Sequence, residues 1–203
     1  MVMICSLVMV VAVGPVAGAA SATGRGTDSS PRAQSCADGG PCVIGDVGPG
    51  QGIVFYDAGS PQPWGRYLEA APRGWNGKGR DPAAQWCDKA HSYSGSQIKG
   101  ARGLLVGTGA KNTAAMVAAC KTGAGVLAHA YTGGGRTDWF LPSQGELIAL
   151  YQQKGIVGGL LGGGHWSSSQ ADSGFDWMQD FADGMKINSH TYNRYYVRPV
   201  RSF

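Results

Sequence analysis

Asp138-Trp-Phe-Leu-Pro-Ser-Gln-Gly-Glu-Leu-Ile-Ala-Leu-Tyr151 carries the strongest helix signal in the chain, and the other elements are placed around it. Ser143 and Glu146 have the spacing of a helix capping box, in which hydroxyl and carboxylate each accept a backbone N–H. Apolar side chains then recur on one helix face, at Leu147, Leu150 and Tyr151. We therefore expect a helix that begins after Ser143 and stops near Gly155, with Glu146 in a structural role.

The first residues have the composition of a secretory signal peptide. Residues 1–22 contain no charged side chain, Ile4–Val13 is almost entirely apolar, and Ala20-Ser-Ala22 offers small residues for cleavage. A membrane span needs about 20 apolar residues, so this run is short for one, although an uncleaved anchor stays an alternative. We expect a flexible linker over residues 23–35 and one domain over residues 36–203. The mature protein would be secreted or exposed at the cell surface.

Glycine and charge are unevenly used. The 34 glycines follow no collagen period and punctuate many short elements, which favours a loop-rich α+β domain. The net charge is +4, yet Arg66–Arg102 contains seven Lys or Arg against three acids, and Asp172–Asp183 contains four Asp and no base. Each stretch is either a solvated face or a binding patch. The basic stretch would suit an anionic polymer.

Cysteine usage indicates disulfides. Cys5 would leave with the signal peptide, and an even number of cysteines then stays in the domain: Cys36, Cys42, Cys87 and Cys120. Cys36 and Cys42 enclose a short Gly/Pro-rich loop that closes easily, which leaves Cys87 to pair with Cys120 and to join two helices. Their spacing is not that of a zinc site, so we expect no metal centre.

The remaining elements follow from apolar runs and turn residues. Asp81-Pro82 predicts a helix to about His91, with the Asp as its cap, and Asn112 predicts the cap of another helix through Cys120. A short helix is expected over 126–131. Strands are expected over 52–56, 66–71, 165–169, 177–181, 185–187 and 195–203, with Asp183-Gly184 as a two-residue hairpin turn and Pro199 at an edge or bend.

Five segments in order resemble the secreted bacterial domains known as DUF1566, which are related to the C-terminal domain of a collagen-like adhesin. They are Gly48-Pro-Gly-Gln-Gly-Ile-Val-Phe-Tyr56, Tyr67-Leu-Glu-Ala-Ala-Pro72, Tyr131-Thr-Gly-Gly-Gly-Arg-Thr-Asp-Trp-Phe-Leu-Pro-Ser143, His165-Trp-Ser-Ser-Ser169 and Tyr196-Val-Arg-Pro-Val-Arg201. The resemblance covers residues 43–203 and implies a C-type-lectin-like fold: a small twisted antiparallel sheet, two or three helices, long loops and neighbouring ends. It also implies packing roles for Trp139 and Trp166. His165 departs from the family pattern, which has an aromatic residue there.

An enzyme is the competing hypothesis. Leu141-Pro-Ser-x-x-Glu146 also resembles a helix start in formylglycine-generating enzymes, but the copper-bound cysteine pair which that resemblance implies has no counterpart after Cys120. A glycosidase needs two facing carboxylates, and the Asp172–Asp183 cluster could supply them for wall glycans. The same cluster could hold Ca²⁺.

We expect a non-catalytic binding or adhesion module without a cofactor. Its partner would be a surface glycan, an anionic polymer or a protein, and not a nucleic acid. The candidate ligand-binding residues are Asp172, Asp176, Asp180, Asn188, His190, Tyr192 and Arg194.

Overall fold

The computed structural model describes residues 35–88 and 95–203. The expected signal peptide, and the linker apart from Ser35, lie outside these residues. The chain divides into the units Met1–Arg32 and Ala33–Phe203, and the second holds every described element. No helix in the described part is long and apolar enough to cross a membrane.

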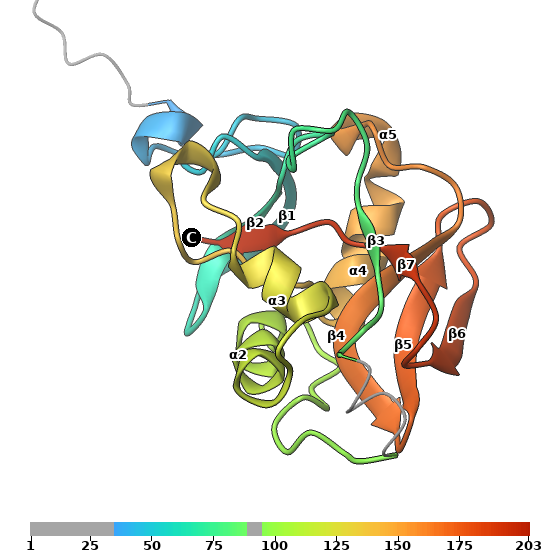
Figure 1. Ribbon diagram of the computed structural model, residues 1–203. Coiled ribbons are helices and arrows are strands. Elements are labelled where there is room, and N and C mark those ends of the chain that lie inside the picture. The colour runs from blue at the N-terminus through green and yellow to red at the C-terminus, as the bar shows by residue number, and fades with distance from the viewer. Residues whose placement is uncertain (1–34, 89–94) are drawn as a thin grey trace, which may run out of the picture. The chain divides into compact units, whose positions relative to one another are not determined.

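The first sheet has three antiparallel strands in the order β1-β2-β8 (Figure 1). They are β1 (Ile53–Gln62), β2 (Gly65–Ala70) and β8 (Val200–Ser202). The strand expected over 52–56 continues to Gln62. Gly59 does not end it, because the pairing with β2 only shifts its register between Asp57 and Gln62. Asp57 stabilises this bend by accepting from the backbone N–H of Gly59 at 2.7 Å.

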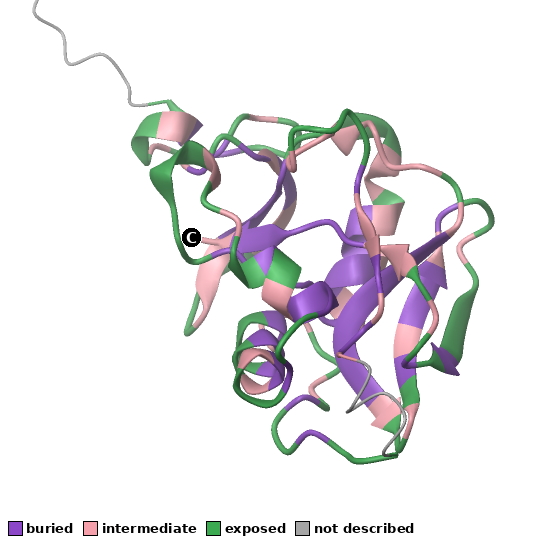
Figure 2. Ribbon diagram, in the orientation of Figure 1, coloured by how far each residue is buried: buried purple, intermediate pink, exposed green. Residues whose placement is uncertain are grey.

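The second sheet has five strands in the order β3-β7-β4-β5-β6. They are β3 (Ala83–Ala84), β7 (Tyr195–Tyr196), β4 (Gly164–Asp172), β5 (Phe175–Asp180) and β6 (Lys186–His190). β4 is buried from Gly164 through Gln170, which gives the sheet its centre (Figure 2). The turn between β5 and β6 is longer than the two residues expected at Asp183-Gly184. The last hydrogen bond between the two strands joins Asp180 to Met185, and four residues lie between them.

In the described part of the chain, four α-helices accompany the sheets: α2 (Gly109–Ala119), α3 (Ala124–His129), α4 (Gln144–Gln152) and α5 (Lys154–Val157). Short 3₁₀ turns are η1 (Cys36–Asp38) and η2 (Gly133–Gly135). The capping box is present: the Ser143 N–H donates to Glu146 Oε2 at 2.7 Å, and the Glu146 N–H donates to Ser143 Oγ at 3.3 Å. The helix ends at Gln152, however, and Gly155 lies inside α5.

The core is built around α4 and the centre of the second sheet. α4 contacts β1 of the first sheet and β4 and β5 of the second, so it joins the two. Leu147 and Leu150 are buried as the helix pattern predicts. Trp139 and Trp166 are fully buried. The described domain is therefore α+β.

Two expected helix starts were wrong. Residues 81–88 are extended around β3, and the rest of the helix expected to His91 lies outside the described residues. Asp81 caps nothing, because Arg198 Nε donates to it at 2.7 Å from the far end of the chain. α2 begins at Gly109, and Asn112 lies buried inside it, where its side-chain amide bonds to the backbone of Gly103.

The expected disulfides are present: Cys36–Cys42 and Cys87–Cys120. The second does not join two helices, because Cys87 follows β3 and only Cys120 stands at a helix end. The expected closing strand is likewise divided at Val197–Pro199, so that β7 enters the second sheet and β8 enters the first.

Candidate functional site

The candidate ligand-binding residues do not form one site. Asp172 is exposed at the end of β4, where it accepts from Gln97 Nε2 at 3.0 Å and from the backbone N–H of Ser173 at 2.8 Å. The Ser173 hydrogen bond, followed by that of Gln97, lowers the Asp172 pKa. Asp180, at the opposite end of β5, accepts from the backbone N–H groups of Gly163 and Ala182. These carboxylates serve local turns.

Asp176 differs from the other aspartates because it is fully buried in the middle of the second sheet. Neither of its carboxylate oxygens has a hydrogen bond of normal geometry in the described structure. Burial raises the Asp176 pKa to about 8, and only the nearby Thr191 hydroxyl acts in the opposite direction. Within residues 35–88 and 95–203, no three His, Cys, Asp or Glu side chains are grouped to hold a metal ion.

Three of the candidates lie on or beside the edge strand β6. The His190 ring stacks on Tyr192 with centroids 4.8 Å apart, and it lies 4.3 Å from Phe175 on the neighbouring strand. Asn188 is exposed on the same strand. Arg194 lies on another surface, beside residues from other segments that were not among the candidates.

That surface is a groove made of three neighbouring hollows, of about 290, 410 and 450 Å³. We call them the apolar slot, the basic hollow and the aromatic hollow. The slot and the basic hollow share Ala83 and Arg194, the basic and aromatic hollows share Asn76, and the slot and the aromatic hollow share Leu127. Their volumes lie near the lower end of the usual range for small-molecule sites, about 300–1,000 Å³.

The wall around β3 is held in place by two buried tryptophans. Trp86 Nε1 donates to the Ser167 carbonyl at 2.7 Å, and Trp166 Nε1 donates to the Ala84 carbonyl at 2.9 Å. The indoles therefore tie the β3 segment to β4 from both sides, which explains why a stretch with a good helix start is extended here. Gly123 completes the wall, since an added Cβ would lie 2.6 Å from the Trp86 carbonyl oxygen.

The basic hollow carries the positive charge of the groove. Lys78, Arg80 and Arg194 line it, and all three are exposed. None of them forms an ion pair in the described part of the chain. Arg194 is positioned by one hydrogen bond, from Nη2 to the Ala83 carbonyl at 2.6 Å, which leaves its other N–H groups for a ligand.

The aromatic hollow lies beside it. Trp75 and Tyr131 line this hollow and pack edge to face, with ring centroids 5.2 Å apart and planes at 66°. Trp75 Nε1 donates to the Val197 carbonyl at 3.0 Å, which fixes the indole. Tyr131 in turn packs 4.9 Å from the buried ring of Trp139. Both aromatic side chains are therefore held rigidly while staying partly exposed.

A buried charged cluster underlies the basic hollow. Asp81 lines that hollow, and its Oδ2 lies 4.0 Å from Nε2 of His165. His165 Nδ1 bonds to the Gly163 carbonyl at 3.1 Å, and His165 Nε2 and Asp81 Oδ1 have no hydrogen bond in the described structure. Burial lowers the His165 pKa to about 4 and raises the Asp81 pKa, although Arg198 opposes the latter. His165 is therefore neutral and packs as an aromatic ring, 4.1 Å from Phe181 and 5.3 Å from Tyr196.

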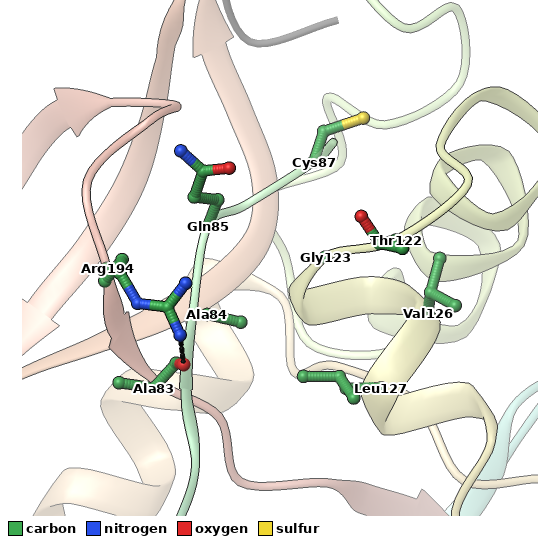
Figure 3. Close-up of a pocket in the computed structure, with 9 residues that line it drawn as sticks. All are labelled: Ala83, Ala84, Gln85, Cys87, Thr122, Gly123, Val126, Leu127 and Arg194. Atoms are coloured by element: carbon green, nitrogen blue, oxygen red, sulfur yellow. Dashed lines mark hydrogen bonds between the residues drawn. The ribbon is translucent and has the colours of Figure 1, made fainter. Parts of the chain in front are cut away.

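The apolar slot lies between β3 and α3 (Figure 3). Its apolar lining is Ala83, Ala84, Cys87, Val126 and Leu127. Besides Arg194, two uncharged polar side chains also line it. Gln85 donates from Nε2 to the Tyr192 carbonyl at 3.0 Å, and Figure 3 shows its amide oxygen on the side of the slot. The second is the exposed Thr122, which follows Cys120 closely in the sequence.

The basic stretch of the sequence contributes only part of this charge. Arg66 pairs with Asp57 in the first sheet at 2.8 Å, and Arg102 donates to the Ala171 carbonyl. Lys78 and Arg80 reach the groove. Sequence reasoning missed the aromatic and apolar walls because they come from three separate segments. The local excess of bases and the candidate Arg194 indicated only the charged part of the site.

Neither the models of known protein families nor the curated proteins give a match to this chain.

Proposed function

We propose that this domain is a non-catalytic binding module that holds an anionic cell-surface glycan in the groove. The observation that carries the proposal is the set of three exposed cations, Lys78, Arg80 and Arg194, beside the fixed Trp75–Tyr131 pair. Cations recognise carboxylate or phosphate groups, and aromatic rings cover the apolar faces of sugars. A ligand that carries both features matches the groove better than a simple ion does.

The cations favour a polymer over a single small ligand. Exposed ion pairs are individually weak, about 0–1 kcal/mol, because water and salt screen them. A chain with repeated charges engages several cations and rings at once. Affinity then rises through multivalency without a deep pocket.

The arrangement gives less support to a wall-glycan hydrolase. Such an enzyme needs two carboxylates facing each other across the substrate, about 5–10 Å apart. The three hollows of the groove contain a single carboxylate in their lining, that of Asp81, and Arg198 occupies it. Asp172 and Asp180 are engaged in turns, and Asp176 is buried.

We further propose that the fold is C-type-lectin-like and that the protein is secreted. Neighbouring ends support the fold: Cys36 and Cys42 pack in one cluster with Tyr67 and Phe203. The two disulfides support an oxidising destination, because such bonds persist mainly in secreted and surface proteins. A collagen-like adhesin's C-terminal domain, which the sequence resembles, is compatible with both.

The proposal is tested by titrating polygalacturonate, which has a carboxylate on every sugar, into the domain. We expect binding that weakens as salt is raised above about 0.15 M, where screening acts within roughly 8 Å. The double variant Lys78→Glu/Arg80→Glu should bind at least tenfold more weakly. A matched control, Lys111→Glu/Lys186→Glu, changes the net charge equally at exposed positions outside the groove. Equal losses in both variants would reduce the effect to net charge and contradict the groove as the site.

A further inference from the structure

We propose that the apolar slot receives the N-acetyl group of an acidic sugar whose carboxylate binds to the cations of the basic hollow. This inference rests on the proposed function and names the class of glycan: an acidic chain with N-acetyl substituents, rather than a plain polyuronate. Three observations carry it, namely the chemistry of the slot walls, the polar pair in the slot, and the position of Arg194.

The walls of the slot suit a methyl group. Leu127 of α3 points toward Ala84 of β3, and Val126 and Cys87 also line the slot (Figure 3). A small acyl group would bury its methyl against these side chains and leave water. A bare sugar hydroxyl would meet mostly carbon there and would lose hydrogen bonds to water without replacement.

The polar pair of the slot supplies the two partners that an amide needs. An acetamido group offers one N–H donor and one carbonyl acceptor beside its methyl. Gln85 uses its Nε2 for the Tyr192 carbonyl, so its Oε1 is an acceptor on the side of the slot. The Thr122 hydroxyl can donate to the acetyl carbonyl. The slot therefore pairs both polar atoms of the group as well as its methyl.

Arg194 couples the slot to the charge site. Its side chain lines both the slot and the basic hollow, and its bond to the Ala83 carbonyl fixes it on the strand that separates them. A ligand with an N-acetyl group in the slot therefore has its neighbouring carboxylate beside a guanidinium. A ligand that lacks either group fills only one of the two hollows.

The slot is rigid enough to select by shape. The Cys87–Cys120 disulfide ties the end of the β3 segment to the end of α2, and the chain enters α3 directly afterwards. The backbone N–H of Ala124 donates to the Gln85 carbonyl at 2.9 Å, which joins the two walls of the slot. Wall separation is thus fixed by a covalent bond and a hydrogen bond, so a larger acyl group would not be accommodated by opening the slot.

The test compares polysialic acid, which has a carboxylate and an N-acetyl group on every residue, with polygalacturonate, which has the carboxylate alone. We expect the wild-type domain to bind polysialic acid at least tenfold more tightly at the same ionic strength. Val126→Phe, which fills the slot, and Thr122→Val, which removes the hydroxyl at constant shape, should each abolish most of this preference. Neither residue lines the basic or the aromatic hollow, so both variants should weaken polysialic acid binding much more than polygalacturonate binding.

Val117→Phe on α2 controls for the added ring, because Val117 has similar partial burial and lines none of the three hollows. Equal affinity of the wild type for both polymers, with both still weakened by Lys78→Glu/Arg80→Glu, would overturn the acetyl slot and leave the proposed function standing. Tighter binding of polygalacturonate would also overturn it. If neither polymer binds, the proposed function and this inference fall together.

Discussion

Two arginines close to the end of the chain, Arg198 and Arg201, each bind a buried carboxylate, but the two carboxylates are bonded to different extents. In the first sheet, Glu69 accepts from Arg201 Nη1 at 2.8 Å and from two backbone N–H groups, so both oxygens are satisfied. Beneath the groove, Asp81 accepts from Arg198 through one oxygen, while the other has no hydrogen bond in the described structure. The first pair is closed, and the second is open on one side.

The closed pair is enclosed by glycine. Backbone N–H groups of Gly50 and Gly52 donate to Glu69 at 2.9 Å each. A Cβ added at Gly48 would lie 2.6 Å from a Glu69 oxygen, and one added at Gly50 would lie 2.7 Å away. The Gly48-Pro-Gly-Gln-Gly52 segment is therefore a backbone cradle for one carboxylate, and its role is structural.

The Asp81–Arg198 pair shows that incompletely hydrogen-bonded groups are present in the second half of the core. Among the described residues, Asp81 Oδ1 and His165 Nε2 have no hydrogen-bond partner, and neither have the two carboxylate oxygens of Asp176 on β5. Buried polar atoms without partners cost stability and tend to cluster near functional surfaces. Here one of them borders the proposed binding groove. Four predictions test the contrast between closed and open groups.

The largest effect is expected from Glu69→Ala. The change leaves Arg201 and two backbone N–H groups without their buried acceptor, and breaking a buried pair in this way costs about 3–5 kcal/mol. Urea unfolding should show a correspondingly lower midpoint. Asp57→Ala, which removes the half-buried partner of Arg66 and the acceptor of the Gly59 N–H, is the control and should lower the midpoint much less. A Glu69→Ala midpoint as high as that of the control would show that the closed pair is not structural.

Asp176→Asn should reveal the open group in the second sheet. The folded pKa of about 8 lies above the unfolded value of about 4, so the fold favours the protonated acid. Wild-type stability therefore declines as pH rises from about 4 through about 8, and asparagine removes this decline. At 1.36 kcal/mol per pKa unit, the variant should gain on the order of 3 kcal/mol at pH about 6, two units above the unfolded pKa, and almost nothing at pH about 4. Parallel pH curves for the two proteins would contradict the burial effect.

His165→Phe should act on the acid side. The folded His165 pKa of about 4 lies below the unfolded value of about 6.5, so the fold excludes the imidazolium. Stability is then lost as pH falls from about 6.5 towards about 4, by roughly 2 kcal/mol, and phenylalanine abolishes this loss while keeping a ring between Phe181 and Tyr196. Thermal unfolding across this pH window measures it. An unchanged acid slope would assign the loss to other groups.

The smallest effect is expected from Ser143→Ala, at a carboxylate that is satisfied without an arginine. Glu146 accepts from the backbone N–H groups of Ser143, Gly107 and Gly109, and these bonds remain in the variant. The loss is the hydroxyl, which caps α4 and donates to the Leu105 carbonyl at 2.9 Å. We expect about 0.5–2 kcal/mol in urea unfolding. An unchanged midpoint would mean that the cap contributes nothing.

Local chemistry explains which elements could be read from the sequence. The Ser143–Glu146 box is complete within three residues, and it predicted the start of α4 correctly. Asp81-Pro82 carries a comparable local signal, but its carboxylate bonds to Arg198, which lies 117 residues away in the sequence. When a potential capping carboxylate instead binds a residue far away in the sequence, the residues next to it give no sign of this. The two disulfides were predictable because parity and a short loop restricted the choices.

The groove was predictable only in part. The base-rich stretch indicated the charge of Lys78 and Arg80, and Arg194 stood among the candidates. Trp75, Tyr131 and the slot walls were missed, because they meet only after α3 packs against the β3 segment. Asp172, Asp176 and Asp180 are close in sequence, yet Asp172 ends β4, while Asp176 and Asp180 lie at opposite ends of β5, about 13 Å apart at roughly 3.3 Å per residue. Proximity in the sequence therefore overestimated their common role.

The segment 72–80, which carries two of the groove's cations, is bonded mainly to itself. The backbone N–H groups of Trp75, Gly77 and Lys78 each donate a hydrogen bond to a residue two or three positions earlier. An added Cβ at Gly77 or Gly79 would meet nothing within 4 Å. Insertions or charge changes after Trp75, over residues 77–80, would leave the core contacts of Trp75 and both disulfides in place. Evolution, or an engineer, could therefore exchange this loop for another and obtain domains with one scaffold and different ligand preferences.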